Sequence, residues 1–205
     1  LKEFRVVQQM GALVDIRSFR LSDISLGTIK LDLPDGRGSF TAEYDFTESR
    51  GFVLQVTAGM EIISGTATWL FRAIDPVTGQ LVTADGVGFL RAGEKAAFGY
   101  GINAQADTAR TGDRITASVR AFATSGAPMD SNTVVNTIAA TPPVTTLTAT
   151  PAGAGRYELR WSAADAPAGS GLASHTLFVA VNGGPYVALL RHTTDTSYTF
   201  AADAT

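Results

Sequence analysis

Apolar and polar residues alternate along much of this chain of 205 residues. In the segment 40–46, every second residue is apolar or aromatic, and the residues between are Thr, Glu and Asp. Segments 29–33 and 115–121 follow the same pattern. Because successive side chains leave a β-strand on opposite faces, this period of two is typical of strands with one buried face. The pattern therefore predicts strands whose apolar residues, such as Phe40 and Tyr44, turn toward a core.

Short segments rich in Gly, Pro, Asp and Asn separate these runs. They are residues 33–38, 75–80, 84–88, 109–113 and 181–185. Such residues supply the positive or fixed φ angles of tight turns, and Asn182-Gly183 between two alternating runs is a strong hairpin signal. A helical period is strongest, and still weak, in residues 11–21. Short strands separated by frequent turns predict an all-β fold of the sandwich type.

A domain boundary is expected near residue 140. The stretch 136–155 has no charged residue and contains the adjacent prolines Pro142 and Pro143. Adjacent prolines stiffen the chain and cannot donate hydrogen bonds to a sheet. We therefore expect two β-sandwich modules in tandem, namely residues 1–140 with about nine strands and residues 141–205.

Composition narrows the function classes. The net charge is −3 and basic residues do not cluster, so the positive surface that nucleic-acid binding requires is missing. The absence of cysteine excludes disulfides, thiolate metal sites and a cysteine nucleophile. Apolar runs are short, and no membrane insertion is expected. The opening LKEFRVVQQM has neither an initiator Met nor an apolar signal segment, which suggests a segment of a longer polypeptide.

The second module carries WSAADAPAGSGLASH from Trp161 and VAVNGGPY from Val179. This stretch resembles a fibronectin type III domain, most closely its bacterial variants, over residues 144–201. His175 stands where that family usually has Tyr. The chain is also one residue shorter before Asn182, a change that can shift the register of the hairpin.

The resemblance implies an immunoglobulin-like sandwich with five of its strands present. They are A (about 145–150), B (156–162), C (173–181), C′ (185–190) and E (196–201). Without the family's strands F and G, one sheet keeps an open edge beside strand C. Three explanations are open: the chain is cut short, a neighbouring chain supplies the strands, or the reduced sandwich closes by itself.

The first module also carries distinctive motifs: WLFRAIDPVTG from Trp69, GFL at 88–90, TGDRI from Thr111 and NTI at 136–138. They resemble a module of unknown function that recurs in large bacterial secreted and surface proteins, over about residues 5–139. That module commonly precedes a type III-like domain. The sequence departs from the pattern of that module at GFLRAGE, which lacks the prolines that usually follow the Leu. Another departure is AFATSGAPMD, which lacks the usual Asp-x-Asn, so a cation bound there would be lost from this copy.

Few residues are suited to catalysis. The two histidines are His175, on the apolar face of a predicted strand, and His192, at a strand end. A nucleophile needs a base that is oriented by an acid, and zinc needs spaced His or Cys ligands. Neither arrangement is present, so we predict no catalytic, metal or cofactor-binding residues and no cofactor. His175 is expected to be a core or semi-buried residue, and His192 is expected to be solvated.

Acidic residues admit a structural and a functional interpretation. Asp residues beside Gly-containing turns either accept hydrogen bonds from the backbone or bind Ca²⁺, and the missing EF-hand spacing favours the first role. These residues are Asp32, Asp35, Asp75, Asp85 and Asp113. Glu43 and Asp45 alternate with core positions, which favours a solvated outer face over a glycosidase pair.

Three further groups also favour a structural role. Trp69, Phe71 and Ala73 are expected in the core rather than on a sugar-stacking platform. An internal isopeptide bond would require Lys30 or Lys95 to be buried beside an Asn. The Gly-rich segment 98–105 is expected to be a strand, because it lacks the spacing of a phosphate-binding loop.

The sequence thus predicts a non-catalytic structural or adhesive module of a large exported bacterial protein, located outside the cell or on its surface. A spacer, a stalk or a surface-assembly element fits this description. The alternative is an accessory polysaccharide-binding module of a secreted hydrolase, which would show as an exposed aromatic row. The expected partners are other domains of the same polypeptide or neighbouring copies, through the open strand edge, and a glycan under the alternative.

Overall fold

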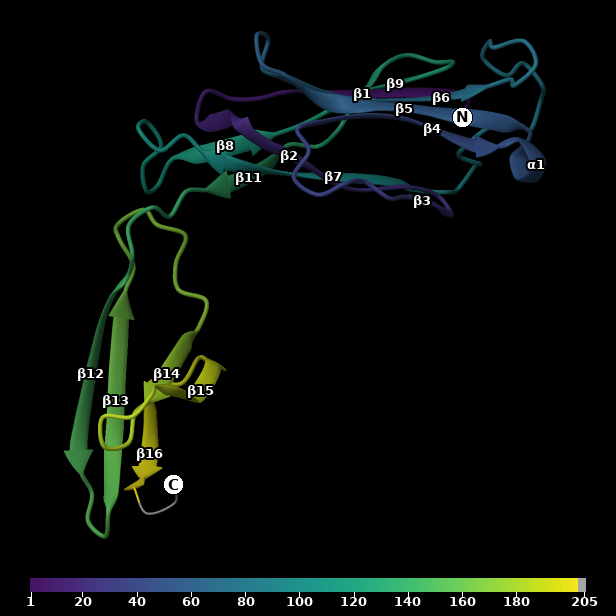
Figure 1. Cartoon of the computed structure of the whole chain (residues 1–205). Coiled ribbons are helices and arrows are strands. Elements are labelled where there is room, and N and C mark those ends of the chain that lie inside the picture. The colour runs from purple at the N-terminus through teal and green to yellow at the C-terminus, as the bar shows by residue number, and fades with distance from the viewer. Residues whose placement is uncertain (203–205) are drawn as a thin grey trace. The chain divides into compact units, whose positions relative to one another are not determined.

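Figure 1 shows the computed structural model, which describes residues 1–202. The described chain is almost entirely β-structure, with strands β1 to β16 and one single-turn helix, α1 (Thr47–Arg50). It divides into two compact units. Unit 1 comprises Leu1–Ala109 and Arg114–Asn136, and unit 2 comprises Arg110–Asp113 and the chain from Thr137 onward.

The larger sheet of unit 1 has six antiparallel strands in the order β10-β9-β1-β6-β5-β4. Their bounds are β1 Glu3–Gln9, β4 Ser39–Phe46, β5 Phe52–Glu61, β6 Thr66–Ile74, β9 Arg120–Ala123 and β10 Met129–Asp130. The first strand, β1, lies inside this sheet. It pairs with β6 along its whole length and with β9 over Phe4 to Val7.

The facing sheet of unit 1 has the order β3-β2-β7, and β8 pairs with β11 beside it (Figure 1). The bounds are β2 Val14–Leu26, β3 Ile29–Leu31, β7 Ala96–Ala104, β8 Arg114–Ala117 and β11 Val134–Thr137. Segment 11–21, where the helical period was strongest, lies mostly in β2. The pairing of β2 with β7 changes register between Asp15 and Arg20 and again between Leu21 and Ile24. These irregularities break the period of two and explain the weak strand signal.

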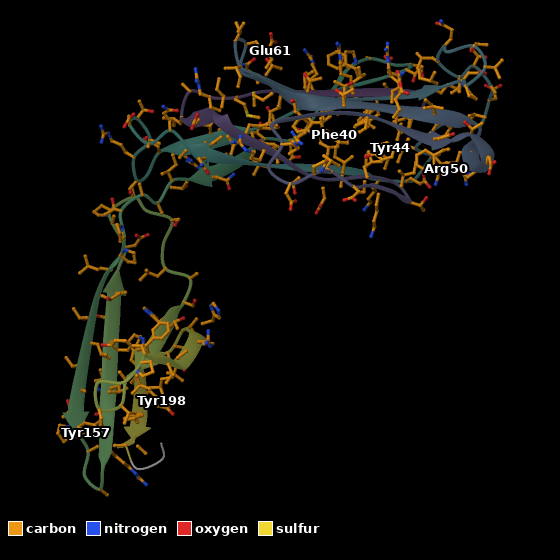
Figure 2. The ribbon with its side chains drawn as sticks, in the orientation of Figure 1. Phe40, Tyr44, Arg50, Glu61, Tyr157 and Tyr198 are labelled. Atoms are coloured by element: carbon orange, nitrogen blue, oxygen red, sulfur yellow. The ribbon has the colours of Figure 1, made fainter. Side chains whose placement is uncertain are left out.

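Aromatic side chains fill the space between the two sheets of unit 1. The ring of Trp69, only 1% exposed, lies 5.1 Å from Phe98 and 5.8 Å from Tyr100, measured between centroids. Phe19 stacks on Tyr100 at 5.2 Å. On β4, Phe40 and Tyr44 point into this layer (Figure 2), and the alternating outer residues Thr41 and Glu43 are exposed. The predicted inner face of this strand is therefore confirmed.

Residues 1–140 contain eleven strands, whereas about nine were expected. Part of the difference lies in the alternating run 115–121. Its predicted inner residues, Ile115 to Ala121, are the more buried ones, but the run is divided between β8 and β9. The two-residue strand β10 adds another, and so short a strand has no alternation to detect.

Unit 2 contains a three-stranded sheet, β12-β13-β16, and a separate hairpin, β14-β15. The bounds are β12 Val144–Pro151, β13 Arg156–Ala164, β14 His175–Val179, β15 Val187–Thr193 and β16 Ser197–Ala201. All five strands predicted in this part of the chain are confirmed, with shifts of a few residues at their ends. The all-β class is likewise confirmed for residues 1–202.

The hairpin of unit 2 contains the expected turn in a longer loop. Asn182 and Gly183 have φ angles of 52° and 76°, and the Gly184 N–H donates to the Val181 carbonyl at 2.9 Å. However, the β14-β15 ladder ends at Val179 and Val187, and its register shifts on either side of Leu177. The chain therefore does not form the tight two-residue hairpin that Asn-Gly favours.

Candidate binding site

The candidate site is a cavity of about 310 Å³ inside unit 2, between the three-stranded sheet and the β14 strand. Leu147 and Trp161, which are register partners on β12 and β13, contribute one wall. His175 and Leu177 of β14 contribute the opposite wall. Apolar side chains from both sheets would ordinarily meet across such a space, and here they leave it open.

Trp161 is the main buried side chain at this site. It is 8% exposed, and the His175 ring meets it edge-on at 6.4 Å. Its indole Nε1 is buried and donates to no acceptor among the described residues. A buried donor without a partner costs about 1–3 kcal/mol. An occupant of the cavity that carries an acceptor would therefore gain from bonding to this group.

The cavity also runs along the free edge of β14. Its lining includes the consecutive residues Ser174 to Phe178, although alternate residues of a strand point to opposite faces. No residue of β15 lines it. Within the described chain, β14 pairs with β15 alone, so its other edge borders the cavity. Within residues 1–202, the edge of β14 opposite β15 therefore has no strand partner.

The lining of the cavity has no Asp, Glu, Lys or Arg side chain and mixes apolar residues with Thr, Ser and His. The chain carries none of these four charged residue types from Ala166 to Leu190. Leu147 is 59% exposed and Phe178 is 57% exposed. An uncharged edge strand with exposed apolar neighbours is a surface that readily pairs with another strand.

The two histidines lie where the sequence placed them. His175 is half-buried at the cavity, and His192 is exposed on β15. His192 adopts φ of 51°, an angle that non-glycine residues rarely take. No sequence signal indicated this angle, and no other predicted site residue lines the cavity.

The acidic residues near turns are spread along the chain. Asp75 accepts hydrogen bonds from the N–H groups of Val77 and Thr78 at 2.8 and 3.0 Å, and Asp113 accepts one from Arg110 at 2.9 Å. The carboxylates of Asp32, Asp35 and Asp85 accept no hydrogen bond within residues 1–202. Over the same residues, no cluster of three or more His, Cys, Asp or Glu is placed to hold a metal ion.

The outer face of β4 carries the other acidic pair. Glu43 is exposed and accepts a hydrogen bond from Gln55 at 2.8 Å. Asp45 is exposed and accepts a hydrogen bond from the Thr47 N–H at 2.8 Å. Hydrogen bonds from the Thr47 side chain and backbone lower the pKa of Asp45. Both residues lie on a solvated face, as predicted.

Two functional alternatives are wrong. Trp69, Phe71 and Ala73 are 1%, 0% and 0% exposed, so they belong to the core and cannot form a sugar-stacking platform. Lys30 and Lys95 are exposed, and neither has the burial that an internal isopeptide bond requires. The core interpretation of the Trp69 strand is therefore confirmed.

The hydrogen bonds to Asp75 lead to a prediction about acid stability. The bonds from Thr78 and Val77 hold the pKa of Asp75 below its usual value. A lowered pKa in the folded state stabilises the fold above the unfolded pKa of about 3.9, and this stabilisation is lost as the pH falls through the folded value. Asp75→Asn should therefore lower the melting temperature of unit 1 near neutral pH, and the difference should vanish toward about pH 2.

Calorimetric melting of both proteins across this pH range tests the expectation. Asp85→Asn is a matched control, because it removes the same charge from an exposed carboxylate that accepts no hydrogen bond within residues 1–202. A constant difference for Asp75→Asn at all pH values would contradict the role of its ionised form.

The part of the chain that the structure describes contains no helix long and apolar enough to cross a membrane. Comparisons of the whole sequence and structure with protein-family models, curated proteins and solved structures give no match.

Proposed function

We propose that this chain is a non-catalytic structural or adhesive module of a large exported bacterial protein, in which unit 1 acts as a spacer. The supporting observation is the path of the chain through unit 1. Leu1 lies toward one end of this unit, and the last strand, β11, lies toward the other end (Figure 1). A domain that the chain enters and leaves at opposite ends adds its length to a stalk.

The position of β1 suits such a role. Tension on the two ends of unit 1 acts along this strand, because β1 starts at the Leu1 end and runs toward the β11 end (Figure 1). Seven residue pairs join β1 to β6, and four join it to β9. These pairs would be loaded together rather than one after another, so sliding the strand requires many hydrogen bonds to break at once.

Composition and motifs give the proposal its biological setting. The low charge, the absence of cysteine and the resemblance of residues 5–139 to a module of bacterial secreted and surface proteins support a location outside the cell. The polysaccharide-binding alternative requires an exposed aromatic surface for sugar stacking. Trp69 and Phe71, the candidates for this surface, are buried. We therefore favour the spacer.

Single-molecule pulling tests the proposal, and the lack of native cysteine makes it practical. In the lengthwise geometry, handles are attached through Leu1→Cys and Asn136→Cys. In the crosswise geometry, they are attached through Asp35→Cys and Ile63→Cys, which flank the edge pair β4-β5 at the same end. We expect a higher rupture force lengthwise, because crosswise pulling separates β4 from β5 one pair at a time.

Both double-cysteine chains should show the same melting temperature, which controls for damage from the substitutions. Equal rupture forces in the two geometries, or a lower force lengthwise, would contradict a spacer that resists tension.

A further inference from the structure

The loop between β14 and β15 carries two adjacent residues that can react with each other. Asn182 is followed by Gly183, and none of the other asparagines in the chain precedes a glycine. Residues 181–187 are exposed throughout. The ladder of the hairpin ends at Val179 and Val187, so no cross-strand pairing protects the residues between them. Both residues are therefore accessible to water.

Few contacts restrain these two residues. Within residues 1–202, the Gly183 N–H and the Asn182 side-chain amide have no hydrogen-bond partner. One bond crosses the turn, from the Gly184 N–H to the Val181 carbonyl at 2.9 Å. A Cβ built on Gly183 would meet no other part of the chain within 4 Å. The Gly183 nitrogen can therefore reach the Asn182 side chain by rotation about the bonds of Asn182, against one hydrogen bond.

We propose that Asn182 is a site of spontaneous covalent modification, in which the backbone nitrogen of Gly183 converts the side-chain amide into a carboxylate. The nitrogen attacks Asn182 Cγ and gives its proton to water. The bond between Cγ and the side-chain nitrogen breaks, and that nitrogen takes up a proton and leaves as ammonia. A succinimide ring that joins the two residues remains. Attack between adjacent groups is favoured because no second molecule has to be positioned.

Water then opens the ring at either of its two carbonyl carbons. The water oxygen bonds to that carbon, the bond from the carbon to the Gly183 nitrogen breaks, and the nitrogen regains a proton. Opening at Cγ gives aspartate at position 182. Opening at the main-chain carbonyl carbon gives isoaspartate, in which the main chain continues through the side chain. The net change is the uptake of water and the release of ammonia, so the reaction needs no other reagent.

The products change the hairpin in two ways. From Ala166 to Leu190 the chain has no Asp, Glu, Lys or Arg, so the new carboxylate brings a negative charge into an uncharged stretch. Aspartate can keep the φ of 52° at position 182, because Asn and Asp both tolerate this region. Isoaspartate lengthens the main chain, so the bond between Gly184 and Val181 no longer fits. The modification lies in unit 2, and it does not depend on the spacer role of unit 1.

Timed incubation of the intact chain at neutral pH, followed by trypsin cleavage and mass spectrometry, tests the proposal. Trypsin places Asn182 in the peptide 161–191, Asn103 in 96–110, and Asn132 with Asn136 in 121–156. We expect 161–191 to gain the mass of replacing NH₂ by OH at least about tenfold faster than the other two peptides. The rate should rise with pH, because the attacking nitrogen must lose its proton.

The chain provides an internal control and a matched pair of variants. Asn132 is exposed like Asn182, but the next residue has a side chain that hinders the attack. Gly183→Ala puts a Cβ beside the attacking nitrogen and should slow the mass gain at least about tenfold. Gly36→Ala is the matched variant, because Gly36 has a similar φ of 71° and equally open surroundings. It should leave the rate at Asn182 unchanged.

The free peptide AVNGGPYV, the sequence of residues 180–187, gives the rate without the fold. We expect the intact chain to react within about tenfold of this peptide, since one hydrogen bond opposes the rotation. A slower reaction than that would show that the turn protects Asn182, and it overturns the proposal. Equal rates in the three tryptic peptides, or an unchanged rate in Gly183→Ala, also overturn it. None of these results would affect the pulling experiment, which concerns unit 1 alone.

Discussion

Replacing Trp69 with alanine is expected to destabilise unit 1 by about 3–5 kcal/mol. The indole is 1% exposed and packs against Phe19, Phe98 and Tyr100, so its removal leaves a cavity that surrounding strands cannot fill. Its Nε1 also lacks an acceptor within the described residues, and loss of that unpaired donor offsets part of the cost. Since a domain is stable by only about 5–15 kcal/mol, unit 1 should become marginal.

Urea unfolding monitored by peptide-level hydrogen exchange measures this effect for each unit separately. Peptides from β1, β5 and β6 should lose protection at lower urea, and peptides from β12 and β13 should not change. Val77→Ala is the control, because Val77 is 91% exposed and its truncation should cost under about 0.5 kcal/mol. A loss under about 1 kcal/mol for Trp69→Ala would contradict the central position of this ring.

Replacing Trp161 with alanine is expected to abolish the folded state of unit 2. In the described part of this unit, Trp161 and Leu177 are the buried large apolar residues. Truncation of a buried Trp costs about 3 kcal/mol or more, and a core this small has little stability in reserve. Peptides from β12 to β16 should exchange at the rate of an unfolded chain, while unit 1 keeps its protection.

The fluorescence of Trp69 gives a second readout, because the chain has two tryptophans and only one remains in this variant. Its emission should stay that of a buried indole. Trp161→Phe is the matched control: it preserves most of the apolar contact and removes the unpaired donor, so unit 2 should stay folded. Retained protection of β13 in Trp161→Ala would show that another contact holds the two sheets together.

The alternation of side chains was sufficient to predict most of the fold. On β4, each inner position is apolar and each outer position is exposed, and on β6 the inner positions are buried and apolar while the outer ones are half-buried or exposed, so the sequence pattern and the burial coincide. In β2, the register changes between Asp15 and Ile24 disturb the alternation, and the local pattern no longer indicates a single face. The two-residue strand β10 pairs with the nearby β9 but is too short to show any alternation.

The candidate site was predictable only in part. The half-buried position of His175 and the free edge beside it could be inferred from a strand pattern and a count of strands. The unpaired Nε1 of Trp161 could not, because the presence of an acceptor depends on the spacing of two sheets and not on local sequence. The same applies to the positive φ of His192, which follows from the irregular pairing of β14 with β15.

The internal position of β1 also has a consequence for how the chain folds during synthesis. Within unit 1, β1 is synthesised before the other strands, yet one of its neighbours is β9, and Val6 pairs with Ala121. Translation adds about 5–20 residues per second, so this edge of β1 stays unpaired for roughly 6–25 seconds until β9 is made. Contacts between residues so far apart also form slowly. Chaperone binding to the nascent chain should therefore be strongest before Ala123, the last residue of β9, has emerged from the ribosome. It should fall sharply afterwards.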